Sequence, residues 1–337
     1  MKKIISVVMM AIMLLAALAG CGNGVQVEDK TDASAVSTAY EPVTVENFDQ
    51  VTEYTEKPER VVALTLNSAE ILAALGEADR LVGIAVNNNT VEDVLPEYAE
   101  AIKAVPVPEQ INTGIPSLEG LLGLSPDLIV ANSYYFNVPT FGTLEDYAGN
   151  GICFYVPEGS YLEKVTVENT YNDIRNLGKI FGKTEDAEKL IQNMKERISG
   201  VQNTVEGQEP VRVMMFDSLN EDLLCVAGGS GLAQNLVELA GGRNVFSNLD
   251  GQFPTVSLED IIKEDPEVIV IHNYTIDPAD AQSKIDYLKN AEEMASVSAV
   301  KNNRIVVIPL FAINPSLQNA DVIETIAAAL YPELFPQ

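Results

Sequence analysis

One pattern occurs twice in this chain, 140 residues apart, and it constrains the fold more than any other feature. The first copy, SLEGLLGLSPDLIV, begins at Ser117, and the second, SLEDIIKEDPEVIV, begins at Ser257. Six of the fourteen positions are identical. Each copy predicts a short helix that a serine caps, then a proline, then an apolar strand. The repeat therefore predicts two similar halves, each built from strands and helices.

Strand and helix patterns alternate around both copies. In the first half, we expect a helix over 67–76, with Asn67 or Ser68 as its N-cap and Gly76 at its end. In the second half, we expect a helix over 229–242 and a last one that begins near Asn319. Apolar, β-branched runs predict strands over 60–66, 80–86, 127–133, 151–157, 211–218, 267–273 and 304–310. Such alternation predicts an α/β fold with mainly parallel sheets.

The middle of the chain lacks this alternation of strand and helix patterns. Val167, Tyr171 and Ile174 begin a series of apolar residues at helical spacing. The series predicts a long helix over about 163–181 and a second helix over 185–203. No Gly/Ser-rich or Pro-rich linker joins the halves, so we expect a stiff connection and little relative movement of the two lobes.

The N-terminus has the pattern of a secretion signal. Lys2 and Lys3 precede an apolar run from Ile4 to Gly20, which is at the short end for a membrane-spanning helix and ends in small residues. The sequence LAGC, which ends at Cys21, resembles the lipobox of bacterial lipoproteins; a plain membrane anchor with an incidental cysteine is the alternative. We expect a signal peptide over 1–20 and a lipid on Cys21. We expect residues 21–50 to form a flexible tether that leads into a first short strand. The lipid then holds the protein at the extracytoplasmic face of the cell membrane.

Charge and composition exclude several classes of function. The formal charge of −28 argues against a nucleic-acid partner, because phosphate backbones need clustered Lys and Arg. With three cysteines and one histidine, the composition argues against a metal site and against a disulfide framework. We expect Cys153 and Cys225, one in each half, to be buried and unpaired. We expect no bound metal, and no cofactor apart from the lipid on Cys21.

The sequence does not favour an enzyme. No Gly-x-Ser-x-Gly motif is present, and no Ser–His–Asp set is assembled around the one histidine. The segment GGSGLAQ, which begins at Gly228, is similar to a dinucleotide-binding fingerprint but lacks its third glycine. We therefore expect a binding protein; an extracellular cleft enzyme and a receptor that feeds a signalling partner remain as alternatives.

The order of several segments resembles one family. ERVVALTLNSAEIL, PSLEGLLGLSPDLIV, YNDIRNLGKIFGKTEDAEKLI, GLAQNLVELAGGRNVFSNLDGQFPTVSLEDIIKEDPEVIVI and NNRIVVIPL look like the substrate-binding lipoproteins of iron–siderophore and cobalamin ABC importers. The resemblance runs from about residue 42 to the C-terminus. It implies two Rossmann-like α/β lobes joined by a long rigid helix, with the ligand in the cleft between them. It assigns 51–160 to the N-terminal lobe, 161–205 to bridging helices and 206–337 to the C-terminal lobe.

The repeated glutamate has two possible roles. Glu119 and Glu259 lie in the first turn of their helices, where a carboxylate interacts favourably with the backbone amides. In the resembled family, a glutamate of each lobe docks on arginines of the permease, and these two occupy the matching positions. The resemblance therefore implies an ABC permease dimer and its ATPase as partners. We expect the protein itself to be a monomer.

Candidate ligand-binding residues follow the predicted strands, because ligands bind beyond the carboxyl ends of strands in open α/β sheets. Aromatic, amide and hydroxyl groups are frequent there, which suits a large, flat and partly apolar ligand; the alternative is that several of the rings are ordinary core residues. The candidates are Asn67, Asn88, Ser133, Tyr134, Tyr135, Tyr155, Tyr161, Phe253, His272, Tyr274, Phe311 and Gln318.

The resemblance implies a small-molecule chelate, a ferric siderophore or, alternatively, a haem or cobalamin ring. The family often has an arginine where this chain has Gln318, and Arg243 is the one basic residue near the predicted rim. A neutral or cationic chelate, such as a hydroxamate complex, or a tetrapyrrole-like ring therefore fits better than a strongly anionic one. His272 is either an axial ligand to haem iron or a buried, hydrogen-bonding residue.

Overall fold

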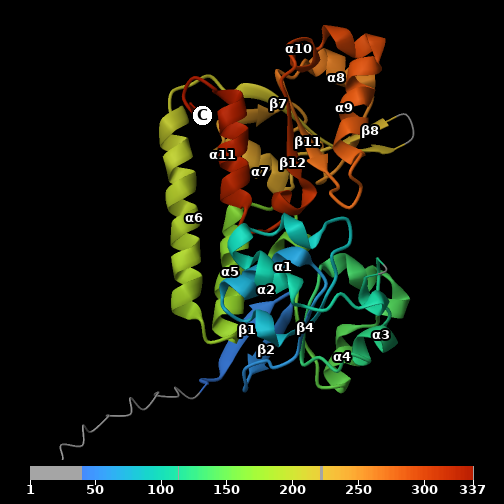
Figure 1. The fold of residues 1–337 in the computed structure, drawn as a ribbon, viewed down its shortest axis with the longest axis vertical. Helices are drawn as coiled ribbons and strands as arrows, with labels where there is room; N and C mark the ends of the chain where they lie inside the picture. Colours follow the sequence, from blue (N-terminus) through green and yellow to red (C-terminus); the bar gives the residue numbers. More distant parts are fainter. Residues whose placement is uncertain (1–39, 113, 221–222, 337) are drawn as a thin grey trace, which may run out of the picture. The chain divides into compact units, whose positions relative to one another are not determined.

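Two separate sheets, one in each lobe, form the frame of the molecule (Figure 1). The computed structural model describes residues 40–112, 114–220 and 223–336. The expected signal peptide, the lipid site at Cys21 and most of the expected tether lie outside these residues. Within the described residues, none of the helices is long and apolar enough to cross a membrane.

The N lobe contains a four-stranded, fully parallel sheet with the order β4-β3-β5-β6. Its two central strands are completely buried, which explains their continuous apolar sequence. The strands are β3 (Val61–Ala63), β4 (Leu81–Ile84), β5 (Leu128–Val130) and β6 (Cys153–Tyr155). The helices are α1 (Leu66–Ala74), α2 (Pro96–Lys103), α3 (Leu118–Leu122) and α4 (Leu144–Gly149).

The C lobe contains a six-stranded sheet with the order β10-β8-β7-β11-β12, in which β9 also pairs with β7. This sheet is mixed, because β7, β11, β12 and β9 pair in parallel while β8 and β10 are antiparallel. The strands are β7 (Val211–Asn220), β8 (Leu223–Val226), β9 (Gly242–Asn244), β10 (Thr255–Val256), β11 (Val268–Asn273) and β12 (Ile305–Pro309). The helices are α7 (Leu232–Leu239), α8 (Leu258–Glu264), α9 (Asp280–Asn290), α10 (Ser298–Lys301) and α11 (Asn319–Leu330).

Two helices connect the lobes. They are α5 (Val167–Ile180) and α6 (Thr184–Val205), and α6 runs along one side of both lobes beside α11 (Figure 1). Arg197 of α6 ties the two helices together through hydrogen-bonded ion pairs with Asp321 and Glu324 of α11, at 2.7 and 2.6 Å. The prediction of two successive long helices is confirmed.

The hydrophobic core supports this connection. One cluster of buried apolar residues is continuous from the N lobe, through α5, α6 and α11, to the C lobe. Two smaller clusters pack on the other faces of the sheets, one in the C lobe and one in the N lobe. The lobes therefore share a core along one side, which is the physical basis for expecting little movement between them.

Several expected boundaries are corrected. The first helix begins at Leu66 rather than Asn67, and its N-cap is Thr65, whose hydroxyl accepts from the amide of Ser68 at 3.3 Å. Residues expected in the tether form β1 (Val43–Asn47), which pairs with β2 (Gln50–Tyr54) in an antiparallel hairpin. The alternation of side chains in this hairpin is too weak to set it apart from a polar tether.

Candidate functional site

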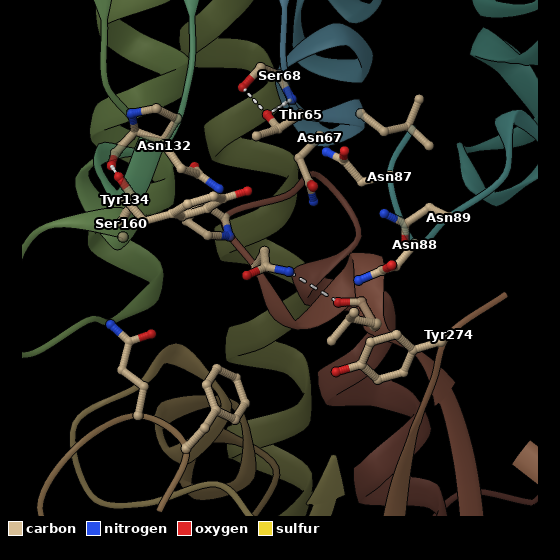
Figure 2. Close-up of a pocket in the computed structure, with 18 of the residues that line it drawn as sticks. Thr65, Asn67, Ser68, Asn87, Asn88, Asn89, Asn132, Tyr134, Ser160 and Tyr274 are labelled. Carbon is tan, nitrogen blue, oxygen red and sulfur yellow. Dashed lines mark hydrogen bonds between the residues drawn. The ribbon is translucent and has the colours of Figure 1, made fainter. Parts of the chain in front are cut away.

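A cavity of about 420 Å³ lies between the lobes at the carboxyl ends of the parallel strands (Figure 2). The N-lobe walls come from the segments after β3, β4, β5 and β6, and the C-lobe walls from β7, the loop before β10 and the segments after β11 and β12. Amide and hydroxyl groups dominate the lining, with a few aromatic rings. The lining residues are Thr65, Leu66, Asn67, Ser68, Asn87, Asn88, Asn89, Asn132, Tyr134, Pro157, Gly159, Ser160, Asp217, Gln252, Phe253, Tyr274, Leu310, Asn314 and Pro315.

Three consecutive asparagines form part of the N-lobe wall (Figure 2). Asn87 adopts a positive φ of 51°, which asparagine tolerates better than most residues, and this lets the chain turn directly after β4. Its amide nitrogen donates to the carbonyl oxygen of Leu64 at 3.2 Å, and that of Asn89 donates to Val86 at 3.2 Å. The amide nitrogens thus hold the turn in place on the cavity wall.

Aromatic rings reach the cavity from both lobes. Figure 2 shows Tyr134 and Tyr274 on opposite sides of it. Tyr134 is 46% exposed and stacks on the buried ring of Tyr135, with 4.4 Å between centroids, and Phe253 is 41% exposed. Exposed rings held by neighbouring side chains are suited to contact a flat or apolar ligand surface.

A hydrogen-bonded acidic cluster underlies the C-lobe wall. Asp217 of β7 is buried; one carboxylate oxygen contacts Nδ1 of His272 at 3.1 Å, and the other accepts from the hydroxyl of Tyr274 at 2.8 Å. Burial acts to raise the pKa of Asp217, but the hydrogen bonds and the charge interaction with His272 outweigh it, so that the pKa lies below the ordinary 3.8. Asp217 is therefore the ionised group of the cavity lining.

Five of the twelve predicted ligand-binding residues lie on the cavity wall. They are Asn67, Asn88, Tyr134, Phe253 and Tyr274. Asn67 also donates its amide to the carbonyl oxygen of Phe311 at 2.7 Å, which links the N lobe to the segment after β12. Their roles in binding stay predictions.

Four predicted N-lobe residues lie away from the cavity, which corrects their expected placement. The rings of Tyr135 and Tyr155 are completely buried, and their hydroxyls donate to Leu64 O at 3.2 Å and to Asp173 Oδ1 at 2.6 Å. Tyr161 packs edge-on against Phe48, and Ser133 donates to the backbone of Ser160. These groups support the wall from behind.

Three predicted C-lobe residues do not lie on the cavity wall. His272 and Phe311 are completely buried, and neither lines the cavity. For His272, this placement agrees with the alternative of a buried, hydrogen-bonding residue. Gln318 is buried at the junction of the lobes, where it donates to Glu70 at 3.0 Å and to the carbonyl oxygen of Asp93 at 2.7 Å. Arg243, expected near the rim, is an exposed residue of β9 and does not line the cavity.

Several polar residues of the lining are not among the twelve predicted candidates: Thr65, Ser68, Asn87, Asn89, Asn132, Ser160, Asp217, Gln252 and Asn314. Asn132 directly follows the buried β5 and its neighbour Ala131, so the position after a strand could have identified it. Ser160 and Gln252 lie in loops without such a signal. Their approach to the cavity depends on how those loops fold back.

The two repeated glutamates are both exposed. Glu119 lies in the first turn of α3 in the N lobe, and Glu259 in the first turn of α8 in the C lobe. Ser117 and Ser257 cap these helices, as the repeat predicts. The positions leave both carboxylates accessible to a partner.

The cysteines of the lobes do not pair. Cys153 and Cys225 are free and only half-buried, which corrects the expectation that both are buried. Among the described residues, no three His, Cys, Asp or Glu side chains lie close enough to hold a metal ion.

Comparisons with known proteins agree with this geometry. The family model described as "Periplasmic binding protein" matches residues 61–310. A protein of Bacillus subtilis (strain 168) named "Uncharacterized ABC transporter substrate-binding lipoprotein YvrC" is 25% identical over 97% of this chain and 98% of its own length. A vitamin B12-binding protein of Pectobacterium carotovorum is 26% identical over 64% of this chain and 71% of its own length.

Solved structures share the fold. A periplasmic binding protein from Veillonella parvula matches with a TM-score of 0.76 and 22% identity, over 86% of this chain and 98% of that one. A structure from Saccharomonospora viridis, titled as an ABC-type Fe3+-hydroxamate transport system, matches with a TM-score of 0.72 and 24% identity, over 88% of this chain and 99% of that one.

Proposed function

The chain belongs to the periplasmic binding protein family, and we propose that it is the solute-binding lipoprotein of an ABC importer that captures a ferric siderophore-type chelate. In this proposal the protein binds its ligand between the lobes and delivers it to a permease dimer driven by an ATPase. A lipid on Cys21 holds it at the extracytoplasmic face of the membrane, and it acts as a monomer that binds without turnover.

One observation carries the proposal of a chelate ligand. The interlobe cavity combines seven amide side chains with exposed aromatic rings and lies at the carboxyl ends of the parallel strands. Amide groups can hydrogen bond to the oxygen-rich surface of a hydroxamate complex, and the rings can pack on its apolar spacers. The Fe3+-hydroxamate structure with the same fold supports this choice.

A corrinoid is the second candidate, and the names of the relatives favour it. Several relatives at about 25% identity are named vitamin B12-binding proteins. Rings such as Tyr134 and Phe253 could pack on a flat macrocycle, and the amides could bind its side-chain amides. For haem, the case is weaker, because His272 is buried behind the wall.

A binding screen tests the proposal. The purified protein is mixed with ferric hydroxamates, ferric catecholates, haem and cobalamins, and its melting temperature and tyrosine fluorescence are recorded; the chain contains no tryptophan. A ligand at about 100 times its Kd stabilises the folded state by about 2.7 kcal/mol, which raises the melting temperature by several degrees. A response to another class of small molecule, with none to these chelates and rings, contradicts the proposal.

A further inference from the structure

The cavity wall, as the described residues form it, carries a negatively charged side chain but no positively charged one. In the part of the chain that the structure describes, no Lys, Arg or His side chain lines the cavity, and Asp217 is its one carboxylate. Lys284, which contacts the backbone of His272 behind the wall, is buried and already hydrogen-bonded. It donates to the carbonyl oxygen of His272 at 2.6 Å and to Asp280 at 2.7 Å. The wall therefore offers a ligand no positive group.

The cluster behind the wall holds two carboxylates, Asp217 and Asp280, and one ammonium group, that of Lys284, which pairs with Asp280 at 2.7 Å. Among the described residues, Asp217 contacts His272 at 3.1 Å but forms no ion pair with a Lys or Arg side chain. One carboxylate oxygen of Asp217 contacts His272 and the other accepts from Tyr274, and a carboxylate oxygen can accept two hydrogen bonds. A buried carboxylate with accepting capacity left is stabilised by a ligand cation, because desolvation is costly for an uncompensated charge.

We propose that the cleft selects a cationic ligand, and that the Asp217 carboxylate is the specificity-determining group that receives the ligand's positive, hydrogen-bond-donating group. This inference rests on the proposed function and narrows its ligand class. Within the chelates it favours a complex with a free ammonium over a neutral analogue of the same shape, and it disfavours anionic catecholates. His272 and Tyr274 position the carboxylate.

Matched ligand pairs test the proposal by calorimetry. Ferrioxamine B carries a free ammonium group, and its N-acetyl derivative has the same metal centre without that charge. Aquacobalamin, cationic below neutral pH, and neutral cyanocobalamin form the corresponding corrinoid pair. We expect the cationic member to bind about tenfold or more tightly, the range of a hydrogen bond between charged groups. We also expect the preference to weaken as salt is added.

Two variants that each remove one negative charge show whether Asp217 causes the preference for the cationic ligand. Asp217→Asn should remove the preference for the cationic member of each pair. Asp250→Asn, an exposed residue of the same lobe outside the cavity lining, should leave the preference intact. Circular dichroism and melting curves establish that both variants fold. Asp217→Glu, which keeps the charge, should retain part of the preference if Asn substitution proves disruptive.

The outcomes separate the two proposals. Equal affinities within a pair, or a preference that survives Asp217→Asn, overturn the charge selection and leave the chelate-binding function standing. Failure of the wild-type protein to bind any chelate or ring contradicts the proposed function and, with it, the selection that rests on it.

Discussion

Single residues at the junction of the lobes decide properties that composition does not reveal. Glu70 of α1 is completely buried; it accepts from the backbone amide of Leu95 at 2.6 Å and from Gln318 of the C lobe at 3.0 Å. An amide therefore stands where a cation would pair with the carboxylate. Burial is the main cause that raises the pKa of Glu70, from an ordinary 4.5 to about 7. The folded state thus prefers this carboxyl group protonated.

Replacing Glu70 by glutamine should change the pH dependence of stability. Since the pKa is higher in the folded state, the stabilising effect of protonation is complete below pH 4.5 and is lost as the pH rises to about 7. Between pH 4.5 and about 7, the free energy of unfolding of Glu70→Gln should therefore rise relative to that of the wild type, by roughly 3 kcal/mol in total. Urea unfolding at a series of pH values measures it. Parallel curves for the two proteins would show that Glu70 is ionised at no cost.

Neighbouring rings have opposite roles that the sequence could not separate. Tyr134 and Tyr135 are adjacent in one 3₁₀ turn, yet the first is 46% exposed at the cavity and the second is completely buried. A position after a strand predicts that a residue is near the ligand edge, but it does not say to which side the side chain turns. The same limit explains why Phe311, which follows β12, was expected on the cavity wall but is completely buried.

Truncation of these rings should distinguish binding from packing. Tyr134→Ala and Phe253→Ala remove exposed rings, so we expect weaker ligand binding, by about three- to tenfold each, with little change in melting temperature. Phe311→Ala should instead lower the free energy of unfolding by about 3–5 kcal/mol, because it leaves a cavity in the core. Calorimetric titration and urea unfolding of the three variants make the comparison. The reverse pattern would place the ligand elsewhere.

At the scale of elements, the buried parallel strands and the long helices were predictable, and the short additional strands were not. β3 and β5 are apolar throughout and β11 is apolar from Val268 to Ile271, because both faces are covered, and such runs are visible in the sequence. The hairpin of β1 and β2 and the short strands β9 and β10 have two to five residues each, with burial that depends on tertiary contacts. Local patterns this short do not identify a strand.

The two Ser-Leu-Glu helices differ in their caps. At α8, Ser257 and Asp260 form a reciprocal capping box, with Ser257 Oγ and the Asp260 carboxylate 2.7 Å apart. At α3 the third residue is Gly120, so Ser117 accepts from its amide at 3.1 Å without a return bond. We expect Ser257→Ala to cost about 1 kcal/mol of stability and Ser117→Ala to cost less. Urea unfolding tests the order, and an equal or reversed cost would mean that the box adds nothing.

At the scale of the whole molecule, the lobes are held together on two sides of the cavity. The shared core joins them along α5, α6 and α11. On the other side, the segment after β11 contacts the N lobe, where the amide of Ile276 donates to the carbonyl oxygen of Asn88 at 3.2 Å and Thr275 contacts Asp93. A rigid pair of lobes keeps the distance between surface groups on α3 and α8 nearly fixed. Such a fixed spacing is what docking on a two-fold symmetric permease requires.

The double variant Glu119→Ala/Glu259→Ala should distinguish transport through the permease from ligand binding. Both carboxylates are exposed and lie outside the cavity lining, so ligand affinity and melting temperature should stay close to the wild-type values. Uptake of the chelate by cells that depend on this protein should fall about tenfold or more if each glutamate pairs with a basic group of the permease. The control is Glu145→Ala/Glu293→Ala, which removes exposed first-turn glutamates of the same two lobes. If both double variants transport as well as the wild type, the repeated glutamates serve their helices and the permease is recognised through another part of the lobes.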